Sequence, residues 1–157
     1  MTTRPGNGVR RFVLVTVLLA AASAPHADRA ALGEPEAAIA GEAQRQHASI
    51  KSTERANYRI HDVALPSGTV LREFSTAGGN VFAVAWSGPV IPDLREALGR
   101  YYDAFAAAAA AKRGGRHRLA IRQDDLVLRS NGHMRAYTGL AYLPQALPAG
   151  VSADELH

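Results

Sequence analysis

The chain contains no cysteine, and this absence excludes several classes of protein. A disulfide-stabilised scaffold, a thiolate zinc site, a cysteine nucleophile and a cysteine-linked lipid anchor all require a thiol. Large apolar side chains are scarce as well, with one Trp, five Tyr and four Phe, whereas 31 of the 157 residues are Ala. The apolar share of 47% therefore overstates the material for a core, and we expect one small domain.

The formal charge of +4 and the pI of about 9.8 do not indicate a nucleic-acid partner once their distribution is considered. Residues 1–27 hold three arginines and no acidic residue, and without them 15 basic residues oppose 14 acidic ones. A chain this close to neutrality gives little support for nucleic-acid binding. A local basic cluster remains, which would suit an acidic polymer or simply a solvated helix end: Arg113, Arg116, His117, Arg118 and Arg122.

The first residues have the layout of a secretory signal peptide. The arginines precede Phe12–Ala22, an apolar run of 11 residues, and small residues with Pro25 follow. Such a run is too short for the roughly 20 residues of a membrane-spanning helix, and no later segment is apolar enough to cross a membrane. We expect a signal peptide over residues 1–27, with Ala24 and Ala31 as other cleavage points, and a periplasmic or secreted mature chain.

The segment after the signal is predicted to be a flexible leader. Residues 33–57 are rich in Ala, Glu, Gln and Ser, and their only larger apolar side chains are Ile39 and Ile50. Two isoleucines cannot offset the entropy of ordering about 25 residues. Residues 28–57 are therefore assigned to a spacer, with a helix that orders on a partner as the alternative.

Residues 58–157 carry the pattern of a single α+β domain. Asp93 and Glu96 have the spacing of a capping box and predict the start of a helix that ends at Gly114-Gly115. Asn131-Gly132 is the strongest hairpin signal in the chain. The pattern predicts an antiparallel sheet of about five or six strands with one amphipathic helix packed on one face. The predicted strands are 58–65, 69–74, 81–86, 118–123, 126–129 and 134–142.

The strand over residues 81–86 is apolar on both faces, which predicts a central position in the sheet. Phe82, Val84 and Trp86 are expected to share one face. This favours a core position for Trp86, with an aromatic platform for a sugar or peptide as the alternative.

The best candidate binding site lies on the last long strand. His133, Arg135 and Tyr137 alternate along it, so strand geometry predicts a polar and aromatic face beside small residues. With Trp86 they form the predicted binding set. An ordinary solvent-exposed face is the alternative.

The sequence shows no catalytic constellation and no pre-arranged metal site. It lacks a nucleophile elbow, a phosphate-binding glycine loop, a dinucleotide fingerprint and a His-x-x-x-His pair. We therefore predict no catalytic residue, no metal and no cofactor. A Ser–His–Asp hydrolase built from dispersed residues stays open, because a triad is defined by geometry rather than by order. The dispersed triad candidates are Ser67, Ser87 or Ser130 with His133 and Asp124 or Asp125. The available metal ligands lie in separate segments, at His61-Asp62, Asp124-Asp125 and His133, so no pair is arranged by its spacing.

Several longer segments are distinctive in their order along the chain: Leu65–Phe74 (LPSGTVLREF), Val81–Pro89 (VFAVAWSGP), Pro92–Arg95 (PDLR), Asn131–Tyr137 (NGHMRAY), Gly139–Tyr142 (GLAY) and Leu147–Asp154 (LPAGVSAD). Together they resemble a proteobacterial family known as domain of unknown function 2844, from about Ala31 to the end of the chain. The resemblance implies a small exported bacterial protein and carries over no activity or cofactor.

We expect, on these grounds, an exported non-enzymatic module of the cell envelope. It would bind an unknown protein or envelope component through its sheet face. The alternative is a small envelope hydrolase with a dispersed His/Asp/Ser site.

Overall fold

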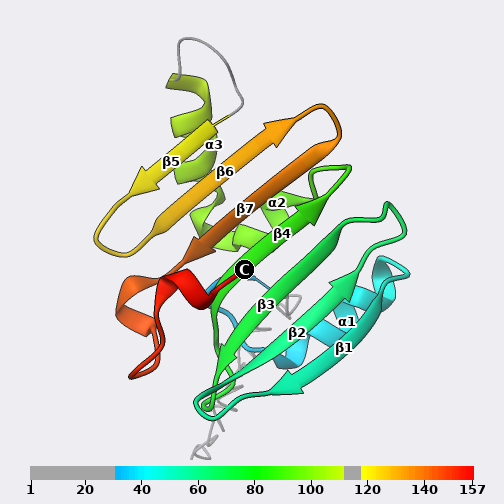
Figure 1. Ribbon diagram of the computed structural model, residues 1–157, viewed down its shortest axis with the longest axis vertical. Coiled ribbons are helices and arrows are strands. Elements are labelled where there is room, and N and C mark those ends of the chain that lie inside the picture. The colour runs from blue at the N-terminus through cyan, green and yellow to red at the C-terminus, as the bar shows by residue number, and fades with distance from the viewer. Residues whose placement is uncertain (1–30, 112–117) are drawn as a thin grey trace, which may run out of the picture.

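Seven antiparallel strands form one sheet in the order β1-β2-β3-β4-β7-β6-β5 (Figure 1). The computed structural model describes residues 31–111 and 118–157, and the predicted signal peptide over residues 1–27 lies outside them. The α+β class and the antiparallel sheet are confirmed, with one strand more than predicted. The strands are β1 (Ser49–Glu54), β2 (Tyr58–Ala64), β3 (Val70–Thr76), β4 (Val81–Gly88), β5 (Arg118–Arg122), β6 (Val127–His133) and β7 (Ala136–Tyr142).

The additional strand comes from the segment predicted to be a flexible leader. Helix α1 (Ala37–Arg45) packs on the sheet through Ile39, which is 3% exposed, and β1 pairs with β2 along its whole length. Upstream of the helix, Leu32 is fully buried. The prediction of a flexible leader was wrong because it counted only large side chains, whereas the small apolar ones here pack closely against the sheet. The buried apolar residues of this segment are Ala31, Leu32, Ala38, Ile39 and Ala43.

The helix predicted after Asp93 begins there, but a turn interrupts it. The Asp93 carboxylate accepts hydrogen bonds from the backbone N–H groups of Arg95 (2.9 Å) and Glu96 (3.2 Å), as a helix N-cap does. Helix α2 (Leu94–Leu98) is followed by a 3₁₀ turn at Gly99, whose φ of +50° and closeness to Ala31 both favour glycine. Helix α3 (Tyr102–Ala111) continues after the turn; the predicted end at Gly114-Gly115 lies outside the described residues.

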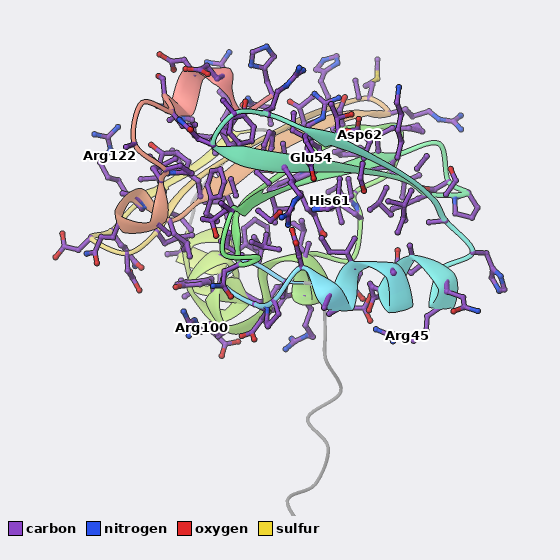
Figure 2. The ribbon with its side chains drawn as sticks, turned by 90° about the horizontal axis from the view of Figure 1, so that it is seen from below. Arg45, Glu54, His61, Asp62, Arg100 and Arg122 are labelled. Atoms are coloured by element: carbon purple, nitrogen blue, oxygen red, sulfur yellow. The ribbon has the colours of Figure 1, made fainter. Side chains whose placement is uncertain are left out.

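The sheet separates two apolar layers. All three helices lie on one face, and the C-terminal segment crosses the other, as Figure 2 shows. Between the helices and the sheet lies the larger core, which includes Leu71, Val84 and Leu98. On the other face, which we call the second face, Phe74 and Leu156 belong to a smaller cluster.

Strand β4 contributes to both layers, as predicted for a central strand, but its faces differ from the prediction. Val84 and Trp86 point to the helices, whereas Phe82 belongs to the cluster on the second face. The register between β3 and β4 shifts at Phe74 and Ser75, so an extra β4 residue is inserted there. This β-bulge breaks the simple alternation and moves Phe82 away from the face of Trp86.

Candidate binding site on the second face

The predicted face of His133, Arg135 and Tyr137 is not formed. Strand β6 continues through Asn131-Gly132 to His133, and the hairpin turn falls at Met134-Arg135, with φ of +27° and +65°. Because Gly132 pairs with Tyr137, these two residues share a face and His133 lies on the opposite one. Arg135 belongs to the turn itself.

The predicted hairpin forms between β6 and β7, but its turn lies beyond Asn131-Gly132, because Gly132 is needed within β6 for packing. A Cβ atom at this position would lie 2.7 Å from Cδ1 of Tyr137, so the glycine leaves room for the tyrosine ring on the adjacent strand. The Asn-Gly pair is a packing feature here rather than a turn signal.

Trp86, the fourth residue of the predicted set, lies in the helix-covered core and is 2% exposed. Trp86 also borders a pocket on the second face, but its indole is buried over Gly139 in the helix-covered core. The structure therefore favours the core interpretation of Trp86 over the aromatic platform.

The second face instead contains a pocket of about 580 Å³. Its floor consists of two rows of side chains that run across four adjacent strands, β3, β4, β7 and β6. The last residues of the chain form a wall. The first row is Val70, Ser87, Thr138 and Asn131; the second is Arg72, Ala85, Leu140 and Arg129; and the wall is Ala153, Asp154, Leu156 and His157.

Of the predicted residues, His133 lies on the same face as this pocket. Arg129, Asn131 and His133 alternate along β6, and the first two line the pocket. The predicted binding set covers the end of this strand, whereas the pocket is lined by residues in its middle. The sequence does show that Arg129 and Asn131 alternate along the strand. This pattern indicates a pocket only when β6 is known to pair with β7, which the sequence does not reveal.

The two arginines of the pocket differ in their partners. Arg72 donates from Nε to Oδ1 of Asp62 at 2.6 Å and from Nη1 to the main-chain oxygen of His157. Arg129 is exposed and, within residues 31–111 and 118–157, has no hydrogen bond or ion pair through its guanidinium. Arg72 is therefore already paired within the protein, whereas the guanidinium of Arg129 can pair with a ligand.

A second polar group lies between the sheet and α1, around His61 (Figure 2). Its Nδ1 is 2.9 Å from Oγ of Ser52, and its Nε2 is 3.1 Å from Oγ of Ser75 and 3.2 Å from Oε2 of Glu36. Glu36 also accepts hydrogen bonds from Ser75 and Arg59. In the sequence, His61 is a candidate only as a metal ligand beside Asp62, and these two residues point to opposite faces of the sheet.

The serine, histidine and glutamate of this group meet the distances of a hydrolase triad, but their bonding is that of a structural network. Burial alone would raise the pKa of Glu36, but the hydrogen bonds from Ser75 and His61 and the charge of Arg59 outweigh burial and lower it. Both ring nitrogens of His61, the hydroxyl of Ser75 and both carboxylate oxygens of Glu36 have partners within the protein, and the group connects the residues before α1 to strands β2 and β3. In the described part of the chain no group of three or more His, Asp or Glu side chains is arranged to hold a metal ion.

Glu73 is a third polar feature and lies in the helix-covered core. It is 1% exposed, and its Oε2 has no hydrogen-bond partner among the described residues. Burial, reinforced by the charge of Glu42, raises the pKa of Glu73 from 4.5 to about 7. This carboxyl group lies on the face opposite the pocket and cannot act on a ligand bound there.

These features define the class: an α+β protein in which one antiparallel sheet carries helices on one face and a pocket on the other. The chain belongs to the family described as Protein of unknown function (DUF2844), whose model matches residues 28–156. This confirms the resemblance seen in the sequence. No curated protein and no solved structure matches the chain. Among the helices that the structure describes, none has the length and apolar character needed to cross a membrane.

Proposed function

We propose that this protein is an exported, non-enzymatic binding or accessory module of the cell envelope, and that the pocket on the second face is its ligand site. The observation that carries the proposal is the pocket itself. Its volume of about 580 Å³ falls in the range of small-ligand sites, about 300–1,000 Å³. Its floor rests on four paired strands, which hold its side chains rigidly.

The pocket side chains suit binding better than catalysis. The pocket does contain Ser87, Asp154 and His157, the residue types of the hydrolase alternative. However, Nδ1 of His157 lies 3.0 Å from the main-chain oxygen of Asp154, not from its carboxylate, and the described residues include no hydrogen bond between His157 and Ser87. Without a base on the serine, the hydroxyl is a hydrogen-bond partner rather than a nucleophile.

Two observations support Ala27 as the cleavage point of the exported chain. The family match begins at residue 28. The domain begins soon afterwards, because Leu32 is buried and its N–H donates to the carbonyl of Ala97 at 3.0 Å. Cleavage after Ala27 would leave four residues before Leu32 and keep its N–H as an ordinary amide. Cleavage after Ala31 would make Leu32 the first residue, with a charged amino group at a buried position.

Export is tested by expressing the full chain in a Gram-negative host and measuring the mass of the protein in the periplasm and medium. We expect a species that begins at Asp28. Retention of the complete chain in the cytoplasm would overturn the export part of the proposal.

To test the ligand site, Thr138 in the pocket floor is replaced by a photo-crosslinking residue, and the variant is expressed in the bacterium that naturally produces the protein. We expect adducts that disappear when Arg129→Gln is introduced. The control crosslinker replaces Asp103, an exposed residue of α3 on the opposite side of the sheet. Equal adducts at both positions, or adducts insensitive to Arg129→Gln, would overturn the pocket as the site. Labelling of Ser52 or Ser87 by a fluorophosphonate would favour the hydrolase instead.

A further inference from the structure

We propose that the pocket recognises the carboxyl-terminal end of a peptide, with the free carboxylate at Arg129 and an apolar last side chain over Ala85 and Leu140. This inference rests on the proposed function and names the ligand class of the same site. It follows from a contact that the protein makes with its own chain, from the charge left available in the pocket, and from the polar row beside it.

The chain itself shows how one side of the pocket holds an extended segment. The side chain of Leu156 is 1% exposed and packs into the apolar cluster of the second face, and the main-chain oxygen of the next residue, His157, accepts a hydrogen bond from Arg72. An apolar side chain and an oxygen acceptor one residue apart are thus a combination that this surface binds.

On the other side of the pocket, Arg129 likewise places a guanidinium beside apolar side chains. The row Arg72, Ala85, Leu140, Arg129 places an arginine at each end of two apolar residues. Three strand spacings separate the two arginine Cα atoms, about 14 Å. Because Arg72 is already bonded to Asp62 and His157, the free guanidinium is the one at Arg129.

A guanidinium binds a carboxylate through two parallel hydrogen bonds, so a free chain end suits Arg129. Asp154 in the wall opposes the accumulation of negative charge and favours a single carboxylate over a dianion.

The first row of the floor favours a peptide over a fatty acid. Ser87, Thr138 and Asn131 are cross-strand neighbours along one line, and they present hydroxyl and amide groups to the pocket. An acyl chain would cover these groups without pairing them, which weakens its binding. The N–H and C=O groups of a peptide can pair with them.

The test compares two probes that differ only in the charged end, N-acetyl-Ala-Leu and N-acetyl-Ala-Leu amide, titrated calorimetrically into the mature protein. We expect the acid to bind at least tenfold more tightly than the amide. Arg129→Gln should reduce the affinity for the acid to that for the amide. Arg129 is exposed, so this variant should keep the wild-type unfolding midpoint, which is measured alongside.

The matched control is Arg122→Gln, which removes an exposed arginine from β5 on the same face of the sheet but outside the pocket lining. It should leave the affinity for the acid unchanged. Equal binding of acid and amide, or equal loss in both variants, would overturn the inference.

A third probe, dodecanoate, separates this inference from the proposed function. If dodecanoate binds with a dependence on Arg129 and the peptide acid does not bind, the peptide ligand is wrong while the pocket stands as a binding site. If no probe binds and the adducts at Thr138 are also absent, the proposed function itself fails.

Discussion

The indole ring of Trp86 lies directly over Gly139, its cross-strand neighbour on β7. A Cβ atom at Gly139 would lie 2.0 Å from Cζ2 and 2.2 Å from Cε2 of the indole. The missing side chain of one residue therefore makes room for the largest side chain of the core. The glycine is needed here for space and not for an unusual backbone angle.

Replacing Gly139 with alanine should destabilise the protein by roughly 1–3 kcal/mol or more, because the indole or the strand must shift to admit the methyl group. Denaturant unfolding followed by Trp86 fluorescence measures the effect. Gly41→Ala is the control: this glycine is exposed in α1, a Cβ there would meet only the flexible Arg45 at 3.5 Å, and alanine should add up to about 1 kcal/mol of helix stability. A Gly139→Ala variant as stable as the wild type would contradict the close packing.

The features that the sequence predicted well are those encoded within a few residues. The N-cap at Asp93 is present, because it depends on a side chain that bonds to backbone groups two and three residues away. The central position of β4 was also predictable, since a strand that is apolar on both sides must be covered on both sides.

The features that were missed depend on contacts between distant segments. Gly132 reads as a turn until Tyr137 is placed beside it. The pocket is a stronger case, because Val70 and Asn131 enter the same row only through the pairing of β4 with β7. Strand order is set by packing over the whole sheet, and no local pattern encodes it.

Helix α1 provides a second prediction, since the sequence analysis placed it in a flexible leader. Ile39 is 3% exposed against the sheet, so Ile39→Ala should cost about 2–5 kcal/mol of unfolding free energy. Ile50, the other isoleucine of this segment, is 38% exposed on β1, and Ile50→Ala should cost about 1 kcal/mol or less. Equal and negligible effects would show that the segment is a leader after all.

The network around His61 provides a third prediction. His61→Ala should cost about 2–3 kcal/mol, because it leaves the buried hydroxyl of Ser75 and the carboxylate of Glu36 with fewer partners. Ser52→Ala should cost less than about 1 kcal/mol, since Ser52 is exposed and water can replace its hydroxyl. Thermal unfolding of both variants measures the difference. A larger loss of stability in Ser52→Ala than in His61→Ala would contradict this, because it would mean that the contact with β1 contributes more than the buried contacts with Ser75 and Glu36.

Glu73 provides a prediction on pH. Its pKa is about 7 in the folded protein against an ordinary value of 4.5, so the folded state binds more protons than the unfolded state between these values. The contribution of Glu73 to stability is therefore most favourable below about pH 4.5 and is lost as the pH rises through 7. A shift of this size corresponds to about 3 kcal/mol.

Glu73→Gln should remove this pH dependence, because the amide stays neutral. We expect the variant to be more stable than the wild type at pH 8 and similar to it at pH 5, as measured by urea unfolding at the two pH values. Glu54→Gln serves as the control, since the Glu54 side chain is 83% exposed and its replacement should leave the difference between pH 5 and pH 8 unchanged. If Glu73→Gln keeps the wild-type difference between the two pH values, the carboxylate is solvated or paired in solution, and the desolvation that raises its pKa is absent.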